Sequence, residues 1–138
     1  MEKYIEELII KAFIVERKKE RARYELYNDK KRGRFLFHIE ISSYIDAGCM
    51  KKIIEPISTY RDMYEVLKKN GAPDSCHVLK THSPHDGQIT TLRQGLDDVL
   101  FNGPGILSCI HGSLAFLEGE HPGAGLGTPV RFLLLKEG

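Results

Sequence analysis

Residues 76–86, CHVLKTHSPHD, gather several side chains that are able to bind a metal ion. They are Cys76, His77, His82, His85 and Asp86. Zinc sites usually place two ligands on one turn, as CxxC or HxxxH pairs do, and the spacing here matches neither pattern. On a strand, Cys76 and His77 would point to opposite faces and could not join one site. We therefore expect no bound metal or other cofactor. If a metal-assisted hydrolase is built on residues 77–86, its candidate ligands are His77, His82 and His85.

Cys109 and His111 form a second candidate pair, because residues two apart on a strand share a face. A nucleophilic cysteine needs a neighbouring base that lowers its pKa and a third group that orients the base. Cys109 lies in the most apolar part of the chain, where a free cysteine usually packs as a small hydrophobic residue. We expect His111 to be a turn residue rather than a base.

Two further patterns near the C-terminus are weak. Glu118 and Glu120 share a strand face, as paired carboxylates for acid–base chemistry would, but Arg131 is available to neutralise one of them. The glycine-rich segment 123–127, GAGLG, lacks the following helix that a phosphate-binding loop requires. We assign no catalytic residue to this region.

The charge of residues 16–34 is unusual for this chain. The segment holds nine lysines and arginines against four acids, a local charge of +5 where the whole chain carries +1. Such a surplus is typical of a surface that meets phosphates or an acidic partner. Tyr24, Tyr27, Phe35 and Phe37 are interleaved, as on a surface that stacks single-stranded bases. The candidate binding residues are Arg17, Lys18, Arg21, Lys30, Lys31, Arg32 and Arg34.

The alternative for this segment is a solvated helix followed by a charged loop, with Phe35 and Phe37 in the core. No RNP, zinc-finger or helix-turn-helix motif accompanies the charges. Three functions therefore stay open. We favour a non-catalytic binding module that holds a nucleic acid or an acidic protein on residues 16–34. The others are the small metal-assisted hydrolase and an oligomeric structural protein, in the simplest case a homodimer joined through its half-apolar N-terminal helix.

Composition limits the class of protein. With 138 residues, of which 41% are hydrophobic and 28% charged, we expect a single domain over residues 1–138. The cysteines are odd in number and far apart, which favours a reducing compartment over a disulfide framework. The N-terminus is acidic where a secretory signal is positively charged. The apolar run LIIKAFIV is far shorter than the roughly 18 residues of a membrane helix. We expect a cytoplasmic protein with no membrane partner.

The N-terminal half is expected to be mainly helical. Residues 3–26 contain no glycine or proline, and their first half carries apolar residues near a 3.6-residue period, so we predict one helix over 3–26. The segment NDKKRG, residues 28–33, is typical of a loop. In residues 34–40, RFLFHIE, alternating apolar residues predict a strand. A short helix is expected around residues 47–54.

The next segments have clearer boundaries. Thr59 and Thr91 are N-cap residues with a partner three positions on, so we predict helices over 59–69 and 91–101. Residues 75–81 suit a strand. Gly95 lies inside the second of these helices, where it lowers helix propensity, and we expect it to permit close approach to a neighbouring strand.

The C-terminal third predicts an antiparallel sheet. Strands over 105–110 and 113–118 are separated by His111-Gly112, as in a tight hairpin. This register pairs Leu107 with Phe116 and Cys109 with Leu114, and residues 130–136 form the closing strand. The whole pattern predicts an α+β fold, mainly an antiparallel sheet with helices packed on one face.

Overall fold

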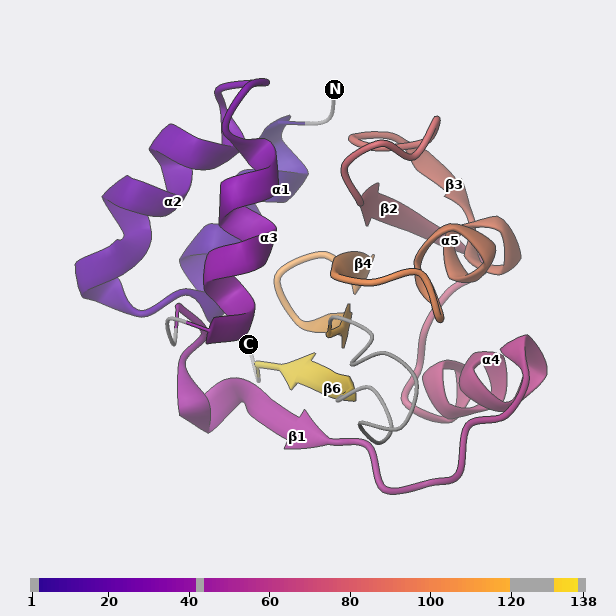
Figure 1. Cartoon of the computed structure of the whole chain (residues 1–138). Coiled ribbons are helices and arrows are strands. Elements are labelled where there is room, and N and C mark those ends of the chain that lie inside the picture. The colour runs from indigo at the N-terminus through magenta and orange to yellow at the C-terminus, as the bar shows by residue number, and fades with distance from the viewer. Residues whose placement is uncertain (1–2, 42–43, 120–130, 137–138) are drawn as a thin grey trace.

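The computed structural model describes residues 3–41, 44–119 and 131–136. At its centre is a six-stranded antiparallel sheet in the order β1-β6-β5-β4-β2-β3 (Figure 1). The fold is α+β, as predicted. The strands are β1 (Met50–Lys52), β2 (Ser75–Leu79), β3 (Ile89–Thr91), β4 (Gly105–Ile110), β5 (Leu114–Glu118) and β6 (Arg131–Leu135). The α-helices are α1 (Lys3–Phe13), α2 (Lys19–Leu26), α3 (Arg32–Ile41), α4 (Tyr60–Lys69) and α5 (Leu92–Val99).

Helices cover both faces of the sheet, so the expectation of one covered face is wrong. α1, α2 and α3 lie on one side, and α4 and α5 lie on the other (Figure 1). The reason is visible in β4, where Ile106 packs into the first core and Leu107 into the second. A strand that is apolar on both faces requires a layer on each side. None of the helices in the described residues is long and apolar enough to cross a membrane.

The single helix predicted over 3–26 is wrong, because the chain bends after α1. Ile14 forms an isolated bridge with Ile45, and the Val15 amide donates to the Tyr44 carbonyl at 2.8 Å. A 3₁₀ turn (Glu16–Lys18) then leads into α2. Ile14 and Val15 are both β-branched, which lowers their preference for a helix, and the contact with residues 44–45 overrides the helical pattern.

The strand predicted over 34–40 is also wrong, since these residues belong to α3. Phe35 and Ile39, four residues apart, are both buried, whereas Phe37 is 50% exposed. Burial at positions i and i+4 is the period of a helix. The alternation in the sequence fits both periods over so short a segment, and the core under α3 decides between them.

The helix predicted around 47–54 is wrong too: a 3₁₀ turn (Ala47–Cys49) leads into the edge strand β1.

The predicted helix starts of α4 and α5 are confirmed. Thr59 and Asp62 form a capping box, and the hydroxyl of Thr91 accepts from the Gln94 amide at 3.1 Å. Gly95 sits where α5 meets the sheet, as expected. A Cβ there would collide with Sγ of Cys76 and lie 3.1 Å from Leu107.

The predicted hairpin of β4 and β5 is confirmed, with one change of register. Leu107 pairs with Phe116 as expected, but Ile110 replaces Cys109 as the partner of Leu114, because the register shifts between Ser108 and Ile110. The turn therefore contains an additional residue, and its Gly112 has a φ of 81°. β6 pairs with β5 along its whole length and completes the predicted meander.

Candidate functional site

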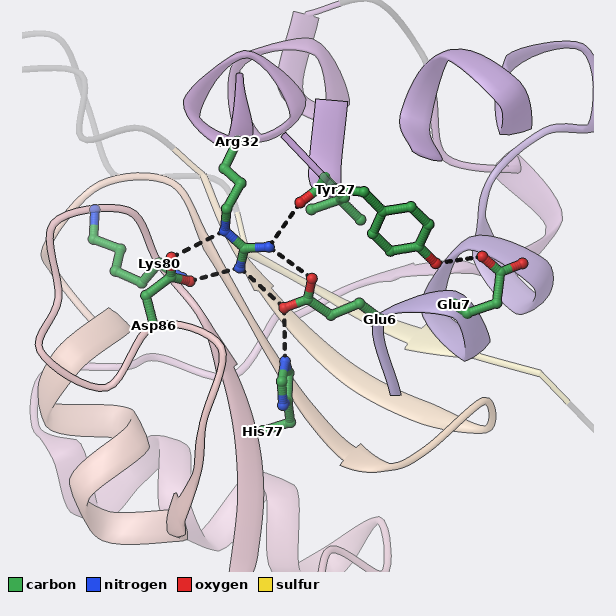
Figure 2. A network of polar contacts seen from close by, with 8 residues as sticks. Glu6, Glu7, Tyr27, Arg32, His77, Lys80 and Asp86 are labelled. Carbon is green, nitrogen blue, oxygen red and sulfur yellow. Dashed lines mark hydrogen bonds and ion pairs between the residues drawn. The ribbon is translucent and has the colours of Figure 1, made fainter. Parts of the chain in front are cut away.

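The basic segment 16–34 divides into a buried part and an exposed part. Arg32, the first residue of α3, is only 2% exposed. Figure 2 shows its guanidinium between the carboxylates of Glu6 and Asp86. Its Nη1 and Nη2 atoms lie 2.7 and 2.9 Å from the two carboxylate oxygens of Glu6. Its Nε and Nη2 atoms lie 3.1 and 2.9 Å from those of Asp86. The placement of Arg32 on a binding surface is therefore wrong, because the protein's own carboxylates occupy its guanidinium.

Glu6 links this arginine to a buried histidine. Its Oε2 atom lies 2.9 Å from Nε2 of His77, and both side chains are fully buried. Burial acts to raise the pKa of Glu6, but hydrogen bonds from His77 and Arg32 outweigh it, and the pKa is lowered from its ordinary value. Nδ1 of His77 has no hydrogen-bond partner in the described part of the chain. This network anchors α1 and α3 to β2.

A second arginine is used internally. Arg23 donates from Nη2 and Nε to Glu7 at 2.8 to 3.1 Å. Glu6, Glu7 and Asp86 all lie outside residues 16–34, so these three acids reduce the surplus of the folded segment from +5 to +2. Fewer of the nine cations of residues 16–34 are therefore available to a partner than the sequence indicates.

Five of the nine cations have no ion pair with any residue that the structure describes. They are Arg17, Lys18, Lys30, Lys31 and Arg34. All flank or lie on the hairpin formed by α2 and α3, two helices that pack together. Tyr24 on α2 and Phe37 on α3 are exposed by 56% and 50%, whereas Phe35 is buried in the core. Tyr27, at the end of α2, is 40% exposed, but its hydroxyl donates to Glu7. We call these cations and the rings of Tyr24 and Phe37 the α2–α3 surface.

Glu25 ties the two helices of this surface together. Its carboxylate is 1% exposed and lies 2.8 Å from Nδ1 of His38 on α3 and 3.5 Å from Nε of Arg21 on α2. Arg21 itself remains 58% exposed. Through His38 and Arg21, the buried Glu25 carboxylate joins α2 to α3.

The loop between β2 and β3 lies against the first turn of α3. The Arg32–Asp86 ion pair is one contact (Figure 2). The other is close packing, since a Cβ at Gly33 would lie 4.0 Å from Cγ2 of Thr81. The loop therefore borders the end of the α2–α3 surface that carries Lys30, Lys31 and Arg34.

This loop and the end of α5 line an open hollow of about 330 Å³. The side chains of chemical interest that line it are Lys80, His82, Ser83, Asp97, Asp98 and Asn102. Beside it, Nδ1 of His85 lies 2.7 Å from Oδ2 of Asp98, and Oδ1 of the same carboxylate accepts from Nε2 of Gln94 at 3.1 Å. Asp98 is not among the residues predicted from the sequence. The spacing of Gln94 and Asp98, four residues apart on one helix face, was the available signal.

The candidate metal ligands are not brought together. His77 is enclosed with Glu6, while His82 and His85 lie on the loop beyond β2. The residues that the structure describes contain no group of three or more histidine, cysteine, aspartate or glutamate side chains able to hold a metal ion.

The remaining candidates have structural partners. Burial raises the pKa of Cys109 to about 12, and His111 contacts the hydroxyl of Ser108 through Nδ1 at 2.7 Å. Glu118 is fully buried, and Nε of Arg131 lies 2.6 Å from its carboxylate, so the predicted neutralisation is confirmed. Glu120 and residues 123–127 lie outside the described residues.

A larger hollow of about 860 Å³ lies between α4 and α5. Its two arginines already have neighbours: Arg61 pairs with Glu65 at 3.1 Å, and Arg93 lies over the ring of Tyr64 at 5.3 Å. The mixed charges of this hollow favour no class of ligand.

The apolar face of α1 is used within the chain. Ile5, Ile9, Ile10 and Phe13 are all fully buried. The reason for predicting a homodimer through the N-terminal helix therefore no longer holds. No family model, curated protein or solved structure gives a match to this chain.

Proposed function

We propose that the protein is a binding module that holds single-stranded nucleic acid on the α2–α3 surface. The observation that carries the proposal is the combination of cations and rings on one helical hairpin. Arg17, Lys18, Lys30, Lys31 and Arg34 keep their charge without an acidic partner among the described residues, and Tyr24 on α2 and Phe37 on α3 are half exposed.

Each part of this surface suits a different part of a nucleic-acid strand. Lysine and arginine side chains that neutralise phosphates release condensed counterions, which gives binding that weakens with salt. An exposed ring stacks on any base, at about 1–3 kcal/mol per base. An acidic protein would satisfy the cations but would leave the rings of Tyr24 and Phe37 without a specific role. For this reason we favour nucleic acid over the acidic-protein alternative.

The test is fluorescence anisotropy of a labelled single strand of about 16 nucleotides, titrated at salt concentrations from about 50 mM to about 200 mM. One variant combines Arg17→Glu, Lys30→Glu, Lys31→Glu and Arg34→Glu. The matched control makes the same change of charge elsewhere, with Lys51→Glu, Lys52→Glu, Lys69→Glu and Lys136→Glu at other exposed lysines.

We expect the surface variant to bind at least about tenfold more weakly and with a smaller salt dependence. The control should stay within about threefold of the wild type, because distant exposed charges are screened. Equal losses in both variants would contradict the proposal, as would a wild-type protein that binds no strand at the lowest salt. Binding to polyglutamate in preference to the oligonucleotide would instead support the acidic-protein alternative.

A further inference from the structure

The loop between β2 and β3 holds an imidazole in the orientation that a proton acceptor needs. Asp98 is 9% exposed and fixed by Gln94, and it accepts from Nδ1 of His85. With Nδ1 donating, the lone pair is on Nε2, which has no partner among the residues that the structure describes. The His85 side chain is 32% exposed. A carboxylate that orients a histidine in this way is the usual support of a general base.

A second imidazole, that of His82, lines the hollow, whereas His85 lies beside it and contacts the lining residue Asp98. His82 lines it together with Lys80 and with the Asp98 carboxylate that holds His85. The φ angle of His82 is 70°, in the left-handed region that residues other than glycine seldom occupy. Such a conformation persists only where the surrounding structure holds it, and it is concentrated at functional sites. Two histidines of one short loop are therefore placed beside a hollow that also contains a lysine.

The hollow is next to the α2–α3 surface. The Arg32–Asp86 ion pair and the contact between Gly33 and Thr81 hold the loop against the turn that carries Lys30, Lys31 and Arg34. Thr81, which contacts Gly33, also lines the hollow, so the hollow adjoins the end of the surface that carries Lys30, Lys31 and Arg34. This adjacency makes the hollow a place where a bound strand could meet both histidines.

We infer that the hollow cleaves RNA by acid–base catalysis, an inference that rests on the proposed nucleic-acid binding. His85 removes the proton of a ribose 2′-hydroxyl at Nε2, and the 2′-oxygen bonds to the adjacent phosphorus. The bond from phosphorus to the 5′-oxygen breaks, and the imidazolium of His82 gives its proton to that oxygen. The products are a 2′,3′-cyclic phosphate and a 5′-hydroxyl. No co-reactant is consumed, and the protons lost and gained balance.

The chemistry selects RNA over DNA, because only RNA carries the attacking 2′-hydroxyl. His82 and His85 are the catalytic residues, since they meet the reacting atoms. Asp98 is a positioning residue that acts through His85. Asp97 also lines the hollow, and its charge opposes a phosphate.

The experiment incubates the purified protein with end-labelled single-stranded RNA in EDTA and identifies the ends of the fragments. Three variants are compared with the wild type: His85→Asn, His82→Ala and Asp98→Asn. Asparagine at 85 places an amide N–H near the position of Nδ1, so it keeps the contact with Asp98 and loses the base. The control is His111→Asn, which likewise keeps the contact of that histidine with Ser108 on the opposite hairpin turn.

We expect cleavage with cyclic-phosphate ends, reduced at least about 100-fold by His85→Asn and by His82→Ala. Asp98→Asn should lower kcat, because the imidazole loses its orientation, and should not raise KM, because the substitution removes a negative charge from the hollow. His111→Asn should match the wild type. DNA of the same sequence should stay intact.

Other outcomes overturn the inference. If RNA is bound but not cleaved, the proposed binding function stands and the inferred cleavage site is wrong. If RNA is neither bound nor cleaved, both are wrong. Cleavage that survives His85→Asn, or that leaves no cyclic phosphate, shows that the hollow is not its source. Thermal unfolding of each variant distinguishes a lost base from a lost fold, and a well-folded His85→Asn protein with full activity is decisive against the inference.

Discussion

Arg32 and Asp86 are 54 residues apart in the sequence, and their side chains meet at 2.9 and 3.1 Å. Their ion pair holds the loop between β2 and β3 against the first turn of α3. The same arginine binds Glu6 of α1, so one guanidinium connects two helices and a loop. The α2–α3 surface and the hollow beside His85 therefore depend on a residue that contributes no charge to the surface.

Replacement of Arg32 tests this connection. Arg32→Met should lower the free energy of unfolding by about 3–5 kcal/mol, because it leaves the carboxylates of Glu6 and Asp86 without their partner. Urea unfolding followed by circular dichroism measures the change. Arg34→Met, two residues on and exposed, is the control and should change stability by less than about 0.5 kcal/mol. Equal stabilities for the two variants would show that the Arg32 network contributes nothing.

The lowered pKa of Glu6 predicts how stability depends on pH. The folded-state pKa lies below the ordinary value of 4.5, so the unfolded chain takes up the proton first as the pH falls. The stability contributed by Glu6 is complete above about 4.5 and is lost as the pH falls through the folded-state value. Urea unfolding at a series of pH values should show this decline, and Glu6→Gln should flatten it. Parallel curves for wild type and Glu6→Gln would contradict the assignment.

Gly95 should tolerate a side chain only when its neighbour is smaller. Gly95→Ala places a Cβ against Sγ of Cys76 and Cδ2 of Leu107, and the overpacking should cost about 1–3 kcal/mol. In a Cys76→Ala background the sulfur is gone, and the helix propensity of alanine, worth about 1 kcal/mol over glycine, should recover much of the loss. The measurement is a double-mutant cycle in urea. Additive effects of the two substitutions would mean that α5 does not meet β2 in this way.

Asp97 should weaken the binding of a phosphate at the hollow. Asp97→Asn removes a negative charge, and a single charge pair in water contributes about 1 kcal/mol at close range, so affinity for single-stranded RNA should rise by up to about fivefold. Anisotropy at low salt measures the change. Glu55→Gln, an exposed acid on the connection between β1 and α4, should leave affinity unchanged. Weaker binding by Asp97→Asn would place the strand elsewhere.

The sequence predicted the parts of the fold whose determinants are local. Thr59 and Thr91 define helix starts through neighbours three residues away, and the β4–β5 hairpin follows from two apolar runs around a short turn. The helix at 34–40 and the break at Ile14–Val15 could not be predicted in the same way. The helix depends on the core that Phe35 and Ile39 enter, and the break depends on contacts with residues 44–45. No periodicity within either segment reveals these contacts.

The site was predicted less well than the fold for a similar reason. The charges of residues 16–34 are visible in the sequence, but the acids that neutralise Arg23 and Arg32 lie in α1 and in the loop after β2. His85 was identified as a candidate from its type alone. Its partner Asp98 comes from α5, and only the packing of that helix beside the loop brings the two together.

The most direct test of the binding surface is an NMR titration of the labelled protein with single-stranded RNA, followed through the backbone amide signals. We predict that the signals that shift will belong to α2, α3 and the loop between β2 and β3, with those near Arg34, Phe37 and His82 moving most. Shifts confined to the α4–α5 hollow, or the absence of any shift at low salt, would contradict the account.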